Sequence, residues 1–122
     1  MPKGVDNMLA FLLAFTITFN NDLDRISDNL DLIYENAIKG HEIETQLKGV
    51  ESELKYFTHK LDLNTLEGRT QAAIVDLYLL SIMQLRDYLK TDYLPTYKNS
   101  IGNKIYADSM LYNLMQAENK KK

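Results

Sequence analysis

Cysteine, histidine and proline are scarce in this chain of 122 residues, and these absences narrow the possibilities. No cysteine is present, which excludes thiol catalysis, a zinc–thiolate site and a structural disulfide. The only prolines are Pro2 and Pro95, so no proline interrupts a helix between them. A chain of this length can bury a sizeable core without a metal or a disulfide. We therefore expect one domain over residues 1–118 and a flexible, lysine-rich tail over residues 119–122.

A large excess of charge and a long apolar run are also missing. The chain has 14 basic and 17 acidic residues, a net charge of −3, which does not suit sequence-independent binding to nucleic-acid phosphates. The most apolar segment, residues 8–19, is shorter than the about 20 residues that a membrane-spanning helix needs. We expect a soluble, cytoplasmic protein that binds no nucleic acid. Insertion of residues 8–19 into a membrane surface is the first alternative.

Motifs that carry catalysis or ligand binding are absent as well. The chain contains no glycine-rich phosphate loop, nucleophile elbow, HExxH motif or EF-hand loop. His41 and Glu44 lie three residues apart, but a di-iron bundle needs Glu-x-x-His twice and further glutamates. We therefore expect no enzyme activity, no cofactor and no metal.

What the sequence does contain is helical periodicity. Leu, Ile, Val, Phe and Met recur at alternating spacings of three and four residues, which places them on one face of a helix. Helices are predicted over about 5–38, 42–61 and 65–91, and a fourth after Pro95. The first is either continuous or bent near residues 20–22, where an Asn-Asn-Asp run could cap a new start. The predicted fold is an all-α, antiparallel four-helix bundle with short connections.

Local signals set the expected helix ends. Gly40 can adopt a positive φ and is expected to stop the first helix. Asn64 and Glu67 resemble a capping box at the start of the third helix, and the sequence Leu94-Pro95 disfavours helix at Leu94. Gly49 lies inside the second helix, where it is expected to mark a close helix crossing. The second helix has the cleanest predicted packing seam, formed by Ile43, Leu47, Val50, Leu54, Phe57 and Leu61.

Asp76 is the candidate functional acid. It falls within residues 72–85, where the third helix is apolar on nearly every side, so we expect its carboxylate to be buried. A buried carboxylate must be paired, hydrogen-bonded or protonated. The predicted role is either a satisfied structural acid or a functional one. In the alternative of a bundle that holds a small ligand or a metal, Tyr78 and Tyr112 line the site with Asp76.

Tyrosine is concentrated near the C-terminus, where six of the eight occur in the last 45 residues. Tyrosine suits half-buried positions and protein interfaces. One interpretation is packing at the rim of the bundle, and the other is an interface centred on Tyr88, Tyr93, Leu94, Pro95 and Tyr97. The fourth helix is predicted to place Tyr97, Ile101, Ile105, Tyr112 and Met115 on one side.

The apolar first half of the first helix indicates a contact with another chain. Leu9, Phe11 and Leu13 lie off its main apolar stripe, and one four-helix monomer has a single core to bury them in. The sequence therefore predicts a non-enzymatic protein-interaction module, a small subunit, adaptor or inhibitor of a larger assembly. We expect it to form a homo-oligomer, most simply a dimer, through this helix.

Overall fold

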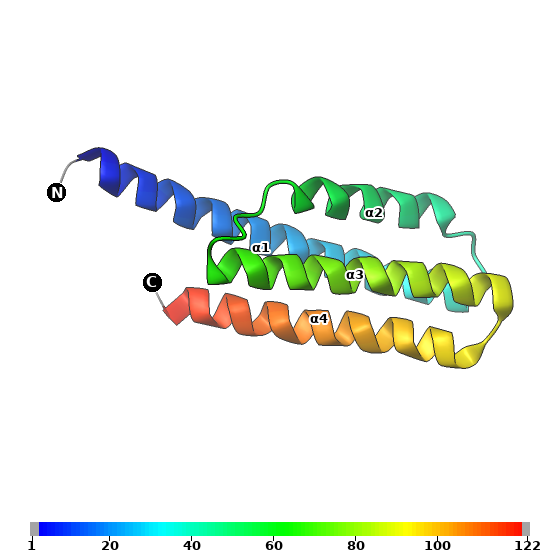
Figure 1. The fold of residues 1–122 in the computed structure, drawn as a ribbon. Coiled ribbons are helices and arrows are strands. Elements are labelled where there is room, and N and C mark those ends of the chain that lie inside the picture. Colours follow the sequence, from blue (N-terminus) through cyan, green and yellow to red (C-terminus); the bar gives the residue numbers. More distant parts are fainter. Residues whose placement is uncertain (1–2, 121–122) are drawn as a thin grey trace.

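The computed structural model describes the backbone of residues 3–120 and the side chains of residues 18–120. Four helices make up almost all of this part: α1 (Lys3–Ile38), α2 (Glu44–Thr58), α3 (Leu66–Thr91) and α4 (Leu94–Lys120). They pack together lengthwise with short connections (Figure 1). The predicted all-α four-helix bundle is confirmed.

Side-chain hydrogen bonds show how the helices run relative to one another. Asn20, in the middle of α1, bonds Glu118 near the end of α4, whereas Tyr34 near the end of α1 bonds Ser100 near the start of α4. α1 and α4 therefore run in opposite directions. Figure 1 shows the same reversal between α3 and α4, which are joined by a tight turn.

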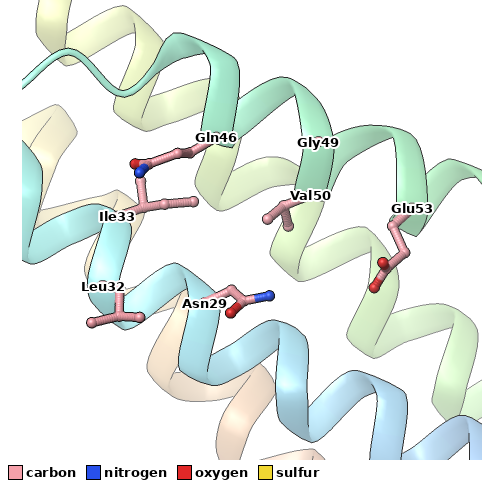
Figure 2. Close-up of a pocket in the computed structure, with 7 residues that line it drawn as sticks. All are labelled: Asn29, Leu32, Ile33, Gln46, Gly49, Val50 and Glu53. Carbon is pink, nitrogen blue, oxygen red and sulfur yellow. The ribbon is translucent and has the colours of Figure 1, made fainter.

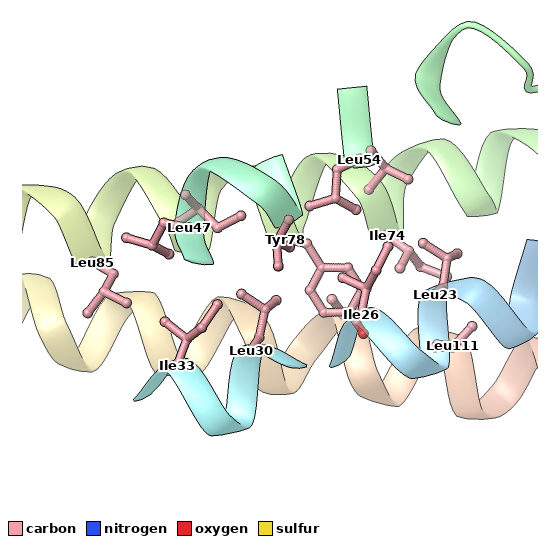
Figure 3. Packing of buried hydrophobic residues seen from close by; sticks show 14 of the residues in the cluster. Leu23, Ile26, Leu30, Ile33, Leu47, Leu54, Ile74, Tyr78, Leu85 and Leu111 are labelled. Atoms are coloured by element: carbon pink, nitrogen blue, oxygen red, sulfur yellow. The ribbon is translucent and has the colours of Figure 1, made fainter. Parts of the chain in front are cut away.

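The core consists of buried apolar side chains from all four helices (Figure 3). α1 supplies one buried residue per turn or nearly so, whereas α4 supplies only Ala107 and Leu111. Burial of each large apolar side chain stabilises the fold by roughly 1.5–3 kcal/mol. The residues labelled in the core are Leu23, Ile26, Leu30, Ile33, Leu47, Leu54, Ile74, Tyr78, Leu85 and Leu111.

α1 is one continuous helix, which answers the question that the sequence left open. Asn20 does not cap a new helix, because its side chain is buried between two other helices. Its amide nitrogen donates to Glu118 Oε1 at 3.0 Å, and its amide oxygen accepts from Gln71 Nε2 at 3.0 Å. Both ends of the amide are satisfied by distant partners, so the helix continues through this position.

The predicted seam of α2 is confirmed, and the predicted role of Gly49 is wrong. Ile43, Leu47, Val50 and Leu54 are buried, and the later seam residues pack against the core. A Cβ atom added at Gly49 would meet nothing within 4 Å, so no helix crosses closely there.

The start of α3 differs by one residue from the prediction. Thr65, and not Asn64, is the N-cap, and its Oγ1 accepts from the Gly68 amide at 2.9 Å. A Cβ atom at Gly68 would lie 1.7 Å from the Asp62 carbonyl oxygen, because the incoming chain crosses the first turn of the helix. Glycine is therefore required at this position.

The other two predicted helix ends are close to the observed ones. Gly40 has a φ of +79° just after α1, as expected of a helix stop. α3 ends at Thr91, and Asp92 follows in the left-handed conformation with a φ of 55°. Helix resumes at Leu94, so the break precedes the predicted one. Pro95 fits in the first turn of α4, where a missing amide hydrogen costs nothing.

Candidate functional site

The buried side of α4 carries a lysine. Lys104 is only 4 % exposed, and its Nζ lies 2.6 Å from Asp31 Oδ1 on α1 and 2.6 Å from Asp108 Oδ2 one turn along α4. Ser27 and Tyr78 donate to Asp108 Oδ1 at 2.7 and 2.6 Å. These five side chains, the Lys104 network, join α1, α3 and α4.

The pKa values of Lys104 and Tyr78 keep each group in a single protonation state at neutral pH. Burial lowers the pKa of Lys104, but the hydrogen bonds and charges of Asp108 and Asp31 together outweigh burial, so the net shift of the pKa is upward. The pKa of Tyr78 is raised by burial first and by the neighbouring Asp108 second. Lys104 is therefore charged and Tyr78 neutral at neutral pH. Neither group is poised to exchange a proton there, and what the arrangement does is hold three helices in register.

Two smaller polar contacts continue the inner side of α4. Near its end, buried Glu118 accepts from Asn20 as described above. Near its start, the Ser100 hydroxyl lies 2.5 Å from the Tyr34 hydroxyl and donates to the Ser81 carbonyl oxygen at 2.6 Å. Burial is the main cause that raises the pKa of Tyr34 to about 12. All the charged residues of α4 between Lys98 and Lys120 thus face inward or lie half-buried.

The outward side of α4 is, as a result, free of charge. The exposed residues between Lys98 and Lys120, which we call the α4 outer face, are all uncharged. Three of them are large: Ile105, Tyr106 and Tyr112 are 57 %, 62 % and 63 % exposed. The α4 outer face consists of Asn99, Gly102, Ile105, Tyr106, Ser109, Tyr112, Asn113, Gln116, Ala117 and Asn119.

This composition is typical of the centre of a protein interface. Single exposed apolar side chains are common on any protein. A run of about 20 helical residues, roughly 30 Å long, without an exposed charge is different, because depletion of charge and enrichment of tyrosine mark interface cores. The described parts of the other helices expose charges, such as Asp28 on α1, Lys48 on α2 and Asp87 on α3.

A second surface feature is a groove between α1 and α2. It has a volume of about 390 Å³ and is open to solvent. Figure 2 shows its residues facing one another from the two helices, with Ile33 and Val50 as apolar lining and Glu53 as the charged member. The Glu53 carboxylate is already paired with Arg25 at 2.5 Å. The groove can accept an apolar side chain, and Asn29 and Gln46 are the neutral polar residues of its lining.

The interface predicted around the α3–α4 connection divides into two parts. Tyr93, Leu94 and Pro95 are exposed, as that prediction requires. Tyr88 and Tyr97 are half-buried and pack against the core, and their ring centroids lie 4.9 Å apart. The rings of these two tyrosines therefore belong to the packing of the bundle and are not free for a contact with another chain.

Asp76 is exposed, so the prediction of a buried acid is wrong. The stripe at seven-residue spacing through Arg69, Asp76, Met83 and Lys90 faces solvent, because the neighbouring helices cover the other sides of α3. Tyr78 is buried and Tyr112 exposed, so these residues do not line one cavity with Asp76. Among the described residues, no three acidic or histidine side chains are arranged to hold a metal ion.

The remaining predicted interface residues, Leu9, Phe11 and Leu13, lie outside the described side chains, although their backbone belongs to α1. In the part of the chain that the structure describes, no helix combines the length and the apolar character needed to cross a membrane.

The sequence prediction missed the α4 outer face because it placed Ile105 and Tyr112 on the same side as Tyr97. One signal could have found it. Lys104, Asp108 and Glu118 follow helical spacing and so lie on one side of α4, which leaves the opposite side without charge.

Comparison of the chain with protein-family models, with curated proteins and with solved structures finds no match. The functional argument therefore depends on the surface chemistry alone.

Proposed function

We propose that this protein is a non-enzymatic interaction module that binds another protein through the α4 outer face. The single observation behind the proposal is the absence of exposed charge along this helix between Lys98 and Lys120. Binding would bury Ile105, Tyr106 and Tyr112, which are more than half exposed in the monomer. Apolar burial contributes about 25 cal/mol per Å², and tyrosine is enriched among residues that dominate binding energy.

The surrounding residues support the same role. Asn99, Asn113 and Gln116 offer neutral hydrogen-bonding groups around the three large side chains. Neutral polar groups are cheaper to desolvate than charges, so a partner can cover them without leaving an ion unpaired. The inward charges of α4 also keep the helix in a fixed register, so the surface is held rigid before binding.

A charge placed on this surface tests the proposal. The variant Ile105→Glu with Tyr112→Glu should keep its helical content and lose binding to protein partners, because each new carboxylate would be buried without a counter-ion. The matched control is Met83→Glu with Leu89→Glu, which puts two carboxylates on exposed apolar positions of α3. Equal binding by the control and by Ile105→Glu with Tyr112→Glu in pull-down and sedimentation assays would contradict the proposal.

The N-terminal half of α1 is a second candidate surface for self-association. α1 has 36 residues and α4 has 27, which corresponds to about 54 Å and 40 Å of helix. Figure 1 shows the first turns of α1 extending past the ends of α3 and α4. Residues 8–19 of this segment are apolar in sequence. We propose Leu9, Phe11 and Leu13 as its contact residues.

Two measurements separate the uses of this segment. Light scattering on Leu9→Glu with Phe11→Glu should show a smaller assembly than the wild type if the segment joins copies of the chain. Flotation with liposomes tests the membrane alternative, because a segment inserted into a bilayer surface would carry the protein upward with the vesicles.

A further inference from the structure

The central row of the α4 outer face alternates small and large side chains. Lys98, Gly102, Ile105, Ser109, Tyr112 and Gln116 follow spacings of four and three residues and are all exposed. Gly102 and Ser109 are small and lie seven residues apart. Ile105 and Tyr112 are large and also lie seven residues apart. The row therefore presents two knobs and two depressions at equal intervals.

The row is complementary to itself when reversed. If two copies of α4 pack antiparallel about a two-fold axis at the level of Ala107, Ile105 of each copy lies over Ser109 of the other. In the same register, Tyr112 of each copy lies over Gly102 of the other. Each large side chain then meets a small one, which allows two helices to approach closely without a clash.

Neither crowding nor backbone conformation requires glycine at position 102 in the described chain. A Cβ atom added there would meet nothing within 4 Å, and the backbone does not have a positive φ. Gly68 differs, because its Cβ would collide with the chain, and Gly40 has a φ of +79°. Glycine weakens a helix relative to alanine. A tyrosine ring from another molecule, seated on the bare backbone, gives Gly102 a function.

Charge also favours a second copy in this orientation. A partner with charged residues would have to bury them against a surface that offers no counter-ion. An identical face brings no charge of its own. In the antiparallel register the exposed Lys98 lies beside Gln116 of the other copy, whereas a parallel pair would place Lys98 against Lys98.

From these observations we infer that the α4 outer face binds the same face of a second copy of this chain, antiparallel, with Tyr112 of each copy over Gly102 of the other. This inference rests on the proposed function and names its partner. A contact made by about 30 Å of one helix from each side lies at the low end of specific interfaces, so the dimer forms and dissociates with concentration.

The natural absence of cysteine makes the register directly measurable. Ile105→Cys carrying a size tag is mixed with untagged Ser109→Cys under mild oxidation. The antiparallel register brings positions 105 and 109 together, so the covalent dimer should be the crossed one, of intermediate size. Each variant alone should cross-link several-fold less. Cross-linking of each variant mainly to itself would indicate a parallel pair and overturn the inference.

Gly102→Leu provides a second measurement with effects of opposite sign. Leucine is a better helix former than glycine, so the thermal midpoint of the monomer should rise. The added side chain occupies the seat of Tyr112, so the dimer dissociation constant in sedimentation equilibrium should increase at least tenfold. Gly49→Leu is the matched control, because Gly49 is also helical, exposed and without neighbours. It should leave dimerisation unchanged.

The outcomes distinguish this inference from the proposed function. A wild type that sediments as a monomer at every concentration overturns the inference. So does a dimer that Gly102→Leu does not weaken, or one that only Leu9→Glu with Phe11→Glu disrupts. The proposed function can hold in each of these cases. It holds if the wild type and the control Met83→Glu with Leu89→Glu both bind a different protein, and Ile105→Glu with Tyr112→Glu does not. It fails if no binding to any protein depends on Ile105 and Tyr112.

Discussion

α1 and α4 lie against each other in the bundle and distribute their charges in opposite ways. The described part of α1 follows the usual rule: Leu23, Ile26 and Leu30 are buried, and acids such as Asp28 face solvent. α4 reverses the rule, since Lys104 and Glu118 are buried and Ile105, Tyr106 and Tyr112 are exposed. The difference teaches that the described part of α1 is fixed mainly by its apolar side, whereas α4 places charged side chains inward and leaves three large apolar or aromatic side chains exposed.

The reversal has an energetic consequence. Buried ions are costly to desolvate, so they add less to stability than well-packed apolar residues would, but removal of one partner leaves the others uncompensated. The Lys104 network joins three helices at fixed positions along their lengths. It therefore helps to specify the register of α4, which has only two fully buried apolar residues, although several of its other apolar side chains pack against the core.

The largest expected effect on stability comes from removal of the buried charge of Lys104. Lys104→Ala should lower the free energy of unfolding by about 3 kcal/mol, because Asp108 loses its cation in a site that is partly shielded from water. Lys98→Ala, on the exposed side of the same helix, should change it by less than about 0.5 kcal/mol. Urea unfolding of both variants measures the difference. Equal midpoints would show that the two sides of α4 do not differ in the way described.

A rise in pH should disturb the inner side of α4 next. The pKa values of Tyr34, Tyr78 and Lys104 are all raised in the folded protein, that of Tyr34 from 10.0 to about 12 by burial. Above pH 10 the folded chain holds more of these protons than the unfolded chain, so the free energy of unfolding falls as pH rises. One pKa unit corresponds to about 1.4 kcal/mol, so Tyr34 alone should remove roughly 2 kcal/mol by pH 12.

Unfolding curves at intervals from pH 8 to pH 12 measure this loss. The contribution should be fully present below pH 10 and should disappear as the pH passes the folded pKa values. Tyr34→Phe is the control, because phenylalanine cannot ionise and should reduce the alkaline slope by the share of Tyr34, while Tyr78 and Lys104 still contribute. A stability that stays constant up to pH 12 would contradict the burial of these groups.

The sequence predicted the buried sides of α1 and α2 well because each of these helices has one repeating apolar stripe, and the structure buries that stripe in their described parts. In α2 the seam from Ile43 to Leu54 has a single repeating side, and the structure buries that side. In α4 apolar residues occur all round the helix, so periodicity does not select a side. Hydrogen bonds to other helices fix the buried side of α4. Asp31 on α1 bonds Lys104, and Tyr78 on α3 bonds Asp108, so both charged side chains face inward. Ile105 is then exposed.

Asp76 and Asn64 were misjudged for related reasons. The stretch around Asp76 is apolar enough to suggest a covered helix, but exposure depends on where the neighbouring helices lie, which composition does not report. Asn64 and Thr65 can both cap a helix. Thr65 is the N-cap in the structure, where the chain before it passes close over Gly68. This contact between the loop and the helix is not visible in a local motif.

Tyr97 offers a smaller effect of the opposite sign on the inner side of α4. Within residues 18–120, its hydroxyl is buried without a hydrogen-bond partner. An unsatisfied buried polar group costs roughly 1–3 kcal/mol, so Tyr97→Phe should raise the free energy of unfolding by about 1 kcal/mol. Tyr34→Phe, which removes a hydroxyl bonded to Ser100, should lower it at neutral pH. Urea unfolding of the two variants tests whether partnered and unpartnered hydroxyls differ in sign.

The smallest expected effects on stability come from variants on the outward sides of α1 and α4, which should differ in self-association. Asp28→Ala and Tyr112→Ala both alter exposed positions, so each should change the free energy of unfolding by no more than about 0.5 kcal/mol. Only Tyr112→Ala should weaken self-association, because Asp28 belongs to a solvated acidic side and Tyr112 to the α4 outer face. Sedimentation equilibrium at several protein concentrations resolves the two variants. If Asp28→Ala weakens association as much as Tyr112→Ala does, the contrast between the two helices does not extend to binding.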